Sequence, residues 1–396
     1  MKILLYGIWG VYNYGCEAIV RGTVNSFSKM YPGATIYYAS FNIEDDARRL
    51  SGCNVSLVQR PFKNPLYKRA IRKLLSYMGV EYHIYVDSFD LIDNYDMVVS
   101  IGGDMYTISS SGEYPYSLMK FGDEVLARGK KYILWGCSIG PFEAKPKVLL
   151  LMKKHLTNVS LIVGREVSTI EYLKALGITE NVIYAPDPAY KVAVENEKVM
   201  EEPVLGDIKV IGINLSPLSS LYFTRNIDEA ISNQANTIIS LIESFSCSVI
   251  LLPHVLSNHE KDDDYGYLKG IYEIVNNKYP EKITIVNNDP GFIGLKETLK
   301  TCDVVIAARM HCAVNAITCK VPAIFLSYSK KSQGMANLVY GNSNFVMDLA
   351  LFNNTKSVIE KIHEISKIDL LEFYKNVDQL KNESGLKSVK KRINWE

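Results

Sequence analysis

The sequence predicts a two-domain α/β protein in which each domain is a doubly wound, mostly parallel sheet. Its 396 residues exceed the roughly 100–200 residues of an ordinary domain. Short apolar or β-branched runs recur at intervals that leave room for one helix between them, which is typical of parallel strands joined by crossover helices. This rhythm is interrupted once, so we expect an N-terminal domain over residues 1–205 and a C-terminal domain over residues 206–396.

The first domain is predicted from runs that are rich in β-branched and apolar residues. The expected strands lie at 2–6, 35–40, 55–58, 97–101, 131–135, 160–163 and 181–184. Between residues 193 and 207 the chain is rich in Glu, Lys, Val and Pro without a clear period, so we place the linker there.

The second domain repeats the pattern. Strands are expected at 209–215, 248–252, 283–286, 304–307 and 322–326, with helices at 227–245 and 262–276 between them. From residue 356 onward the apolar residues keep helical spacing, and we expect these C-terminal helices to pack across the domain junction. Two such domains facing a cleft form the glycosyltransferase B-type architecture, in which ligands bind near the carboxyl ends of the strands.

The amino-acid composition limits the kinds of partner and cellular setting that we expect. The 44 Lys and Arg residues balance 43 Asp and Glu residues, so no strong overall field is available to attract nucleic acid. Seven scattered cysteines without a Cys-x-x-Cys pair indicate a reducing, cytoplasmic setting. No run approaches the roughly 18 apolar residues of a membrane span. The basic, amphipathic stretch 63–78 would suit peripheral contact with the inner face of a membrane, although a solvated surface helix explains such a pattern more often.

A glycine-rich segment follows the first expected strand and opens a helix. It contains Gly7, Gly10, Asn13 and Gly15, and Glu17 lies in the first helical turn. Backbone amides at a helix start suit an anionic or polyhydroxyl ligand. The spacing matches neither the Gly-x-Gly-x-x-Gly fingerprint nor a phosphate loop. Alternatively, the segment is only a tight turn, with Asn13 near the helix cap and Glu17 complementing the helix dipole.

Further short motifs follow later strands of both domains. They are Ile101-Gly102-Gly103-Asp104, Trp135-Gly136-Cys137-Ser138, Gly164-Arg165-Glu166, Ala185-Pro186-Asp187, Gly212-Ile213-Asn214, Leu252-Pro253-His254, Arg309-Met310-His311 and Tyr328-Ser329-Lys330-Lys331. In kind and in order, these motifs and the glycine-rich segment resemble those of the polysaccharide pyruvyl transferases over roughly residues 1–345. The chain differs from that family's pattern at Cys16, Asp104 and Cys137-Ser138.

The resemblance implies an enzyme that transfers pyruvate from phosphoenolpyruvate to sugar hydroxyls as a ketal, with release of phosphate, in exopolysaccharide or cell-surface glycan biosynthesis. Phosphoenolpyruvate would be the donor substrate and no cofactor would be required. The acceptor would be a glycan or a lipid-linked sugar. The resemblance further implies that the C-terminal domain is the phosphoenolpyruvate side and the N-terminal domain the acceptor side.

The donor brings a carboxylate and a nearly dianionic phosphate into one site, so several cations are needed. Arg165, Arg309 and Lys331 each lie just after an expected strand and are candidate clamps, with surface ion pairs as the alternative for each. The resemblance adds a larger set of substrate-binding candidates, namely Asn13, Gly15, Gly103 and Tyr328.

Acid and base candidates complete the predicted site. His311 follows Arg309 by two residues at an expected helix start and would protonate the methylene carbon of the donor or the departing phosphate. Glu17 and Asp104 are candidate bases for the sugar hydroxyls, although Asp104 could equally cap the next helix.

No metal is expected. His254 and His259 are spaced i, i+5, and the acidic run 262–264 resembles a solvated helix start. Two other functions remain open at this point: a nucleotide-sugar-dependent glycosyltransferase of the same fold, and a non-catalytic glycan-binding relative.

Overall fold

The computed structural model describes residues 1–61, 70–71, 74–75, 88–109, 112–192, 205–221, 224–327, 331–382 and 384–393. The chain divides into two compact units. Unit 1 comprises Met1–Gly10, Ile19–Pro188 and Glu383–Glu396, and unit 2 comprises Val11–Ala18 and Ala189–Asn382. The division was expected at 205/206 but falls at 188/189. In addition, residues 11–18 belong to the second unit and the C-terminal segment belongs to the first. The stretch 63–78 and the linker at 193–207 lie largely outside the described residues.

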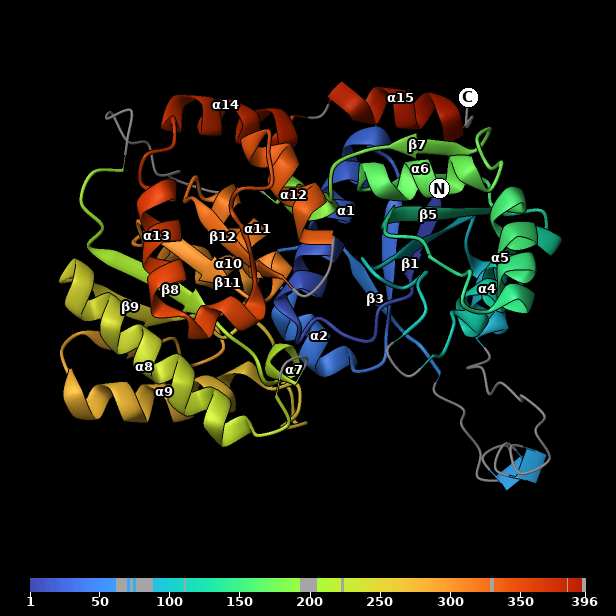
Figure 1. The fold of residues 1–396 in the computed structure, drawn as a ribbon. Coiled ribbons are helices and arrows are strands. Elements are labelled where there is room, and N and C mark those ends of the chain that lie inside the picture. The colour runs from blue at the N-terminus through green and yellow to red at the C-terminus, as the bar shows by residue number, and fades with distance from the viewer. Residues whose placement is uncertain are drawn as a thin grey trace. The chain divides into compact units, whose positions relative to one another are not determined.

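Unit 1 is built on a sheet whose strands are all parallel, in the order β3-β2-β1-β4-β5-β6-β7 (Figure 1). The order reverses between β1 and β4, which creates a topological switch point at the carboxyl edge of the sheet. The strands are β1 (Lys2–Tyr6), β2 (Thr35–Ser40), β3 (Ser56–Gln59), β4 (Met97–Ile101), β5 (Lys131–Cys137), β6 (Leu161–Gly164) and β7 (Val182–Tyr184).

Helices cover both faces of this sheet, because its strands alternate buried side chains between the two faces. Leu4 and Tyr6 pack with α4 and α5 into one core cluster, and Figure 1 shows these two helices close together. Trp135 contacts Phe27 of α1, with ring centroids 4.9 Å apart. The helices of this part are α1 (Tyr14–Met30), α2 (Ile43–Arg49), η1 (Phe89–Asn94), α4 (Tyr116–Ala127), α5 (Pro146–Asn158), α6 (Val167–Ala175) and, at the end of the chain, α15 (Ser384–Ile393). Residues 14–18 of α1 belong to unit 2, and so does η2 (Pro188–Lys191) after its first residue.

Unit 2 contains a second parallel sheet in the order β10-β9-β8-β11-β12-β13, with its switch point between β8 and β11. The strands are β8 (Val210–Asn214), β9 (Ser248–Leu251), β10 (Ile283–Ile285), β11 (Val304–Ala307), β12 (Ala323–Ser327) and β13 (Val346–Asp348). The two sheets confirm the predicted pair of doubly wound α/β folds.

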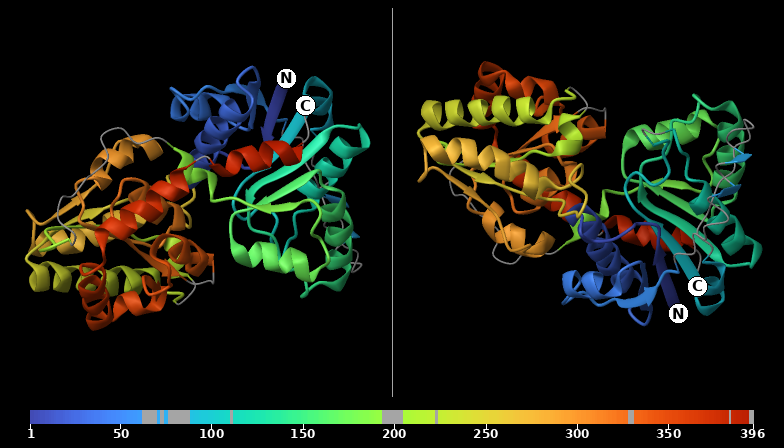
Figure 2. Two further views of the ribbon diagram at one scale, coloured as in Figure 1. Left: turned by 90° about the horizontal axis from the view of Figure 1, so that it is seen from above. Right: turned by 90° about the horizontal axis from the view of Figure 1, so that it is seen from below.

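The helices of unit 2 lie on both sides of its sheet, and α8 and α9 run side by side (Figures 1 and 2), joined by an ion pair of 2.8 Å between Glu243 and Lys278. The helices are α7 (Pro217–Ser220), α8 (Ile227–Phe245), α9 (Asp264–Lys278), α10 (Gly291–Leu299), α11 (Met310–Thr318), α12 (Lys331–Tyr340), η3 (Leu349–Asn353), α13 (Thr355–Ile365) and α14 (Leu370–Lys381). The predicted C-terminal helices therefore divide between the units, since α15 belongs to unit 1. In the described ranges, no helix combines the length and the apolar character that crossing a bilayer requires.

Candidate functional site

Arg309 lies at the switch point of unit 2. It follows β11 by two residues and is the N-cap residue of α11. Its backbone N–H donates to the side-chain oxygen of Asn214, the last residue of β8, at 2.8 Å. The two strands that flank the switch point therefore hold Arg309 at the carboxyl edge, where ligands of such folds bind.

The Arg309 guanidinium is anchored by two carboxylates. Nη2 donates to Asp264 and to Asp262 at 2.8 Å each, and Nε donates to Asp264 at 3.1 Å. Burial alone would lower the pKa of Arg309, but the two carboxylates more than offset it and raise that pKa above its usual value, so the side chain stays charged. In the described ranges Nη1 donates to no acceptor, so one edge of the guanidinium is left for a ligand.

The acidic run before α9 is not a solvated helix start, as the sequence had suggested. Asp263 does cap the helix by accepting from the Gly266 N–H at 2.7 Å. Asp264, however, is fully buried. Besides Arg309, its carboxylate accepts hydrogen bonds from the backbone N–H groups of His254 and Val255 and from the side chain of Asn214. It is the internal counter-charge of Arg309.

His311 is packed against the glycine-rich segment. A Cβ atom added to Gly15 would lie 2.7 Å from Nδ1 of His311, so only glycine fits beside the imidazole. Asn13 fixes this turn by accepting from the Gly15 N–H at 2.9 Å. The neighbouring Tyr14 N–H donates to the carbonyl of His254 at 3.0 Å. Asn13, Gly15, Arg309 and His311 are thus brought together within unit 2.

Glu17 is also buried in unit 2, where its carboxylate accepts from the backbone N–H of Phe292 at 2.8 Å. Phe292 lies in the first turn of α10, so Glu17 supplies negative charge at a helix N-terminus, where it is favourable. The residue was expected in the first domain, on the acceptor side. Its role as a base stays a prediction.

His254 is a buried imidazole that the sequence placed in one of the family-like motifs and that was otherwise considered only as a metal ligand. Its ring lies edge-on to Tyr14, with centroids 5.4 Å apart, and to Phe292, at 6.3 Å. Burial, and then the neighbouring His311 and Arg309, lower the pKa of His254 well below its usual value, so the ring is neutral near pH 7. Neither ring nitrogen has a hydrogen-bond partner among the described residues.

Arg165 organises a second cluster, in unit 1. It follows β6, and its guanidinium donates to Asp187 at 2.7 Å, to Asp104 at 3.0 Å and to the hydroxyl of Ser138 at 3.1 Å. A Cβ atom on Gly103 would lie 2.4 Å from Nη1 of Arg165, so this glycine is needed for the close approach. The structure thereby brings together Arg165, Gly103 and Asp104.

The charge of this cluster is negative. Glu166 lies 3.8 Å from Arg165, which therefore faces three carboxylates with one positive charge. The side chain of Arg165 is 1% exposed, whereas that of Asp104 is 56% exposed. These contacts favour a positioning role for Arg165 and leave Asp104 as the group that meets solvent. A cluster of this charge suits hydroxyl donors better than a phosphate.

Among the predicted site residues, Tyr328 and the side chain of Lys331 lie outside the part of the chain that the structure describes. In the ranges that are described, no group of three or more His, Cys, Asp and Glu side chains is arranged to hold a metal ion. The absence of a metal requirement stays a prediction.

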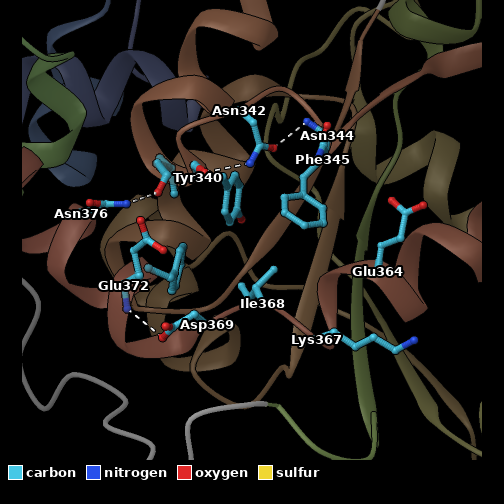
Figure 3. Close-up of a pocket in the computed structure, with 12 residues that line it drawn as sticks. Tyr340, Asn342, Asn344, Phe345, Glu364, Lys367, Ile368, Asp369, Glu372 and Asn376 are labelled. Atoms are coloured by element: carbon cyan, nitrogen blue, oxygen red, sulfur yellow. Dashed lines mark hydrogen bonds between the residues drawn. The ribbon is translucent and has the colours of Figure 1, made fainter.

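A cavity of about 460 Å³ lies elsewhere in unit 2 (Figure 3). Phe345, which lines it, directly precedes β13, so the cavity is at the amino edge of the sheet and apart from Arg309. Several of its polar groups bond to nearby backbone, for example Asn376 to the Val339 carbonyl at 3.0 Å. It is lined by Val339, Tyr340, Asn342, Asn344, Phe345, Glu364, Lys367, Ile368, Asp369, Glu372, Phe373 and Asn376. None of the predicted site residues is among them.

Solved structures share the two-unit fold at low sequence identity. UDP-GlcNAc 2-epimerase from Neisseria meningitidis, bound to UDP-GlcNAc, has a TM-score of 0.59 at 11% identity, covering 99% of each chain. Anabaena Alr3699/HepE in complex with UDP-glucose has a TM-score of 0.57 at 12% identity, covering 99% of this chain and 98% of that one. A glycosyltransferase from Rickettsia africae gives 0.56 at 12% identity, covering 100% and 99%. The fold is therefore of the glycosyltransferase B type, as predicted.

Most of the chain matches the model of a protein family. The family model of polysaccharide pyruvyl transferases matches residues 13–330, and the chain belongs to this family. A relative is the amylovoran biosynthesis protein AmsJ of Erwinia amylovora, 23% identical over 400 residues, covering 93% of this chain and 94% of that protein. The resemblance stated from the sequence is confirmed.

Proposed function

We propose that this protein transfers the pyruvyl group of phosphoenolpyruvate to two hydroxyls of a glycan or lipid-linked sugar, forming a ketal and releasing phosphate in exopolysaccharide or cell-surface glycan biosynthesis. The observation that carries the proposal is the Arg309–His311 pair, held at the switch point of unit 2 by a buried carboxylate. Family membership and the similarity to an amylovoran biosynthesis protein support it.

The donor would bind at the start of α11. Arg309 has Nη1 left to donate, and it is the N-cap residue of α11, whose positive dipole end lies at this point. A helix N-terminus and a guanidinium together suit a phosphate or a carboxylate. Because Asp264 and Asp262 orient the guanidinium from the other side, little side-chain entropy would be lost on binding.

The reaction needs two proton movements that balance. A proton is added to the methylene carbon of phosphoenolpyruvate, which leaves the neighbouring carbon electron-deficient, and one sugar hydroxyl adds there and loses its proton. The second hydroxyl then attacks the same carbon and displaces phosphate. The bond that breaks joins this carbon to the bridging oxygen, so the oxygen leaves with the phosphate. The proton of the second hydroxyl ends on the phosphate. His311 is the proposed acid for the methylene carbon or the departing phosphate.

A base is needed to accept the hydroxyl protons, and Asp104 is our candidate. Its carboxylate is half exposed, and Arg165 holds it at 3.0 Å. Glu17 is the weaker candidate, because its carboxylate already accepts a helix amide.

Calorimetric titration of phosphoenolpyruvate, with UDP in parallel, tests the donor. We expect wild type to bind phosphoenolpyruvate and Arg309→Lys to bind it at least about tenfold more weakly, because lysine keeps the charge but loses the planar fork. Arg128→Lys, in an ion pair in unit 1, is the matched control and should bind like wild type. Binding of UDP but not of phosphoenolpyruvate would favour a nucleotide-sugar glycosyltransferase instead.

A further inference from the structure

A series of aromatic contacts runs from the core of unit 1 to its surface at Trp9. Phe121 stacks on Tyr6 with ring centroids 3.8 Å apart, and Phe41 stacks on Trp9 at 4.9 Å with 14° between the ring planes. Between the two pairs, the Arg60 guanidinium lies 3.9 Å from the Tyr6 ring and 4.4 Å from the Phe41 ring. Trp9 is thereby held in one orientation although it is itself 54% exposed.

Arg60 is a costly group in this position. It is 2% exposed and forms no ion pair with a carboxylate in the described part of the chain. Its Nε has no hydrogen-bond partner there, and the polar groups that its guanidinium contacts are neutral, namely the Gly7 carbonyl, 3.5 Å from Nη1, and the Tyr6 side chain. Burying a cation without a counter-charge is unfavourable, and aromatic faces repay only part of that cost. What the arrangement achieves is a rigid indole at the surface.

The loop that carries Trp9 follows β1, one of the two strands that flank the switch point of unit 1, and the indole contacts residues that follow β2 and β3. Trp9 follows β1, Phe41 follows β2, and Arg60 follows β3, so all three are at the carboxyl edge of the sheet. On the other side of β1, the β4 loop touches the Trp9 loop: a Cβ atom on Gly102 would lie 2.9 Å from the Ile8 side chain. That loop leads directly to Asp104. The most exposed aromatic residue in the described ranges and the candidate base thus lie at the same carboxyl edge, where such sheets bind ligands.

We propose that Trp9 is the stacking platform for the acceptor sugar, on which one face of a hexopyranose ring lies. The axial C–H groups of a pyranose face are weakly positive, and the indole face is negative, so the two attract as aromatic edges and faces do. The stacked sugar would lie at the same carboxyl edge of the unit 1 sheet as Asp104. The assignment of this sugar as the acceptor rests on the proposed function. Binding of the sugar does not.

Saturation-transfer NMR without phosphoenolpyruvate tests the platform. The probes are methyl β-D-galactopyranoside and methyl β-D-glucopyranoside, and mannitol is the control polyol, since it carries hydroxyls but no ring face. We expect wild type to saturate the C–H protons of one ring face of at least one glycoside and to leave mannitol unsaturated. Trp9→Ala should weaken binding about tenfold or more, whereas Trp9→Tyr should stay within about threefold of wild type. Leu150→Ala, at an exposed apolar position of α5, should bind like wild type.

The proposed platform is overturned if neither glycoside binds at about 50 mM. This concentration is on the order of the dissociation constants of weakly bound monosaccharides. The platform is equally overturned if Trp9→Ala binds as wild type does, or if mannitol binds as well as the glycosides. Failure of the proposed reaction looks different. Trp9-dependent sugar binding in a protein that does not bind phosphoenolpyruvate would keep the platform and refute the pyruvyl transfer.

Discussion

Replacing Asp264 with asparagine should destabilise the protein far more than the same replacement of Asp262. Both carboxylates contact Nη2 of Arg309 at 2.8 Å. They differ in burial, because the side chain of Asp264 is 0% exposed and that of Asp262 is 35% exposed. The pair of variants therefore compares a buried and a partly exposed carboxylate on one guanidinium.

The magnitude follows from the hydrogen bonds of Asp264. One oxygen accepts from Arg309, and the other accepts from His254 N–H, Val255 N–H and the Asn214 side chain. An asparagine amide must place its own NH₂ toward one of these two sets of donors, so either orientation leaves donors opposed. With the loss of the charge as well, we expect about 3–5 kcal/mol of destabilisation. For Asp262→Asn we expect less than about 1 kcal/mol.

Differential scanning calorimetry measures this contrast. For a unit of this size, about 1 kcal/mol corresponds to roughly 2–4 °C, so Asp264→Asn should lower the melting temperature by on the order of 10 °C and Asp262→Asn by less than about 4 °C. Circular dichroism at 10 °C checks that both variants are folded before heating. Equal shifts for the two variants would refute the assignment of Asp264 as the buried counter-charge.

Two further predictions concern the surroundings of His311. Gly15→Ala should displace the His311 imidazole, because the new methyl would overlap Cβ and Nδ1 of His311, and it should lower turnover at least about tenfold. The control Gly33→Ala, with no atom within 4 Å of the added methyl, should leave turnover unchanged. Phosphate release from phosphoenolpyruvate measures turnover in both variants, and equal rates would contradict the contact. His254→Phe should remove a loss of stability at low pH. Because the pKa of His254 is depressed in the folded state, the unfolded state takes up its proton more readily below about pH 6.5. The free energy of unfolding of wild type should therefore fall by about 1.4 kcal/mol between pH 7.5 and 5.5 because of this residue. Urea unfolding at both pH values tests this, and the prediction fails if His254→Phe loses as much stability as wild type.

Periodicity in the sequence was sufficient to predict most of the sheet structure. The strands expected at 2–6, 35–40 and 97–101 agree with the observed bounds, because each is a continuous apolar run buried on both faces. Strand β13 (Val346–Asp348) was not predicted, since three residues carry too little pattern. Local signals fix the elements when burial is continuous along them.

The site was harder to predict because its contacts join distant parts of the chain. Asp264 follows two other aspartates and by local pattern begins a helix, yet its partner Arg309 is 45 residues away. Residues 11–18 follow a strand of unit 1 but belong to unit 2, and no local pattern marks that change. The exposed Trp9 gave no signal either, because its orientation depends on Phe41 and Arg60, which come from two other strand ends.

The reaction itself is tested most directly in the producing cells, where the natural acceptor is present. The surface glycan would be purified from cells that carry wild type or His311→Asn, and ketal-bound pyruvate would be measured by its methyl proton resonance and by acid release. The proposed reaction predicts that the glycan of wild-type cells contains pyruvate ketal and that the glycan of His311→Asn cells contains none, with immunoblotting to show equal protein levels. Equal pyruvate content in the two glycans would contradict it.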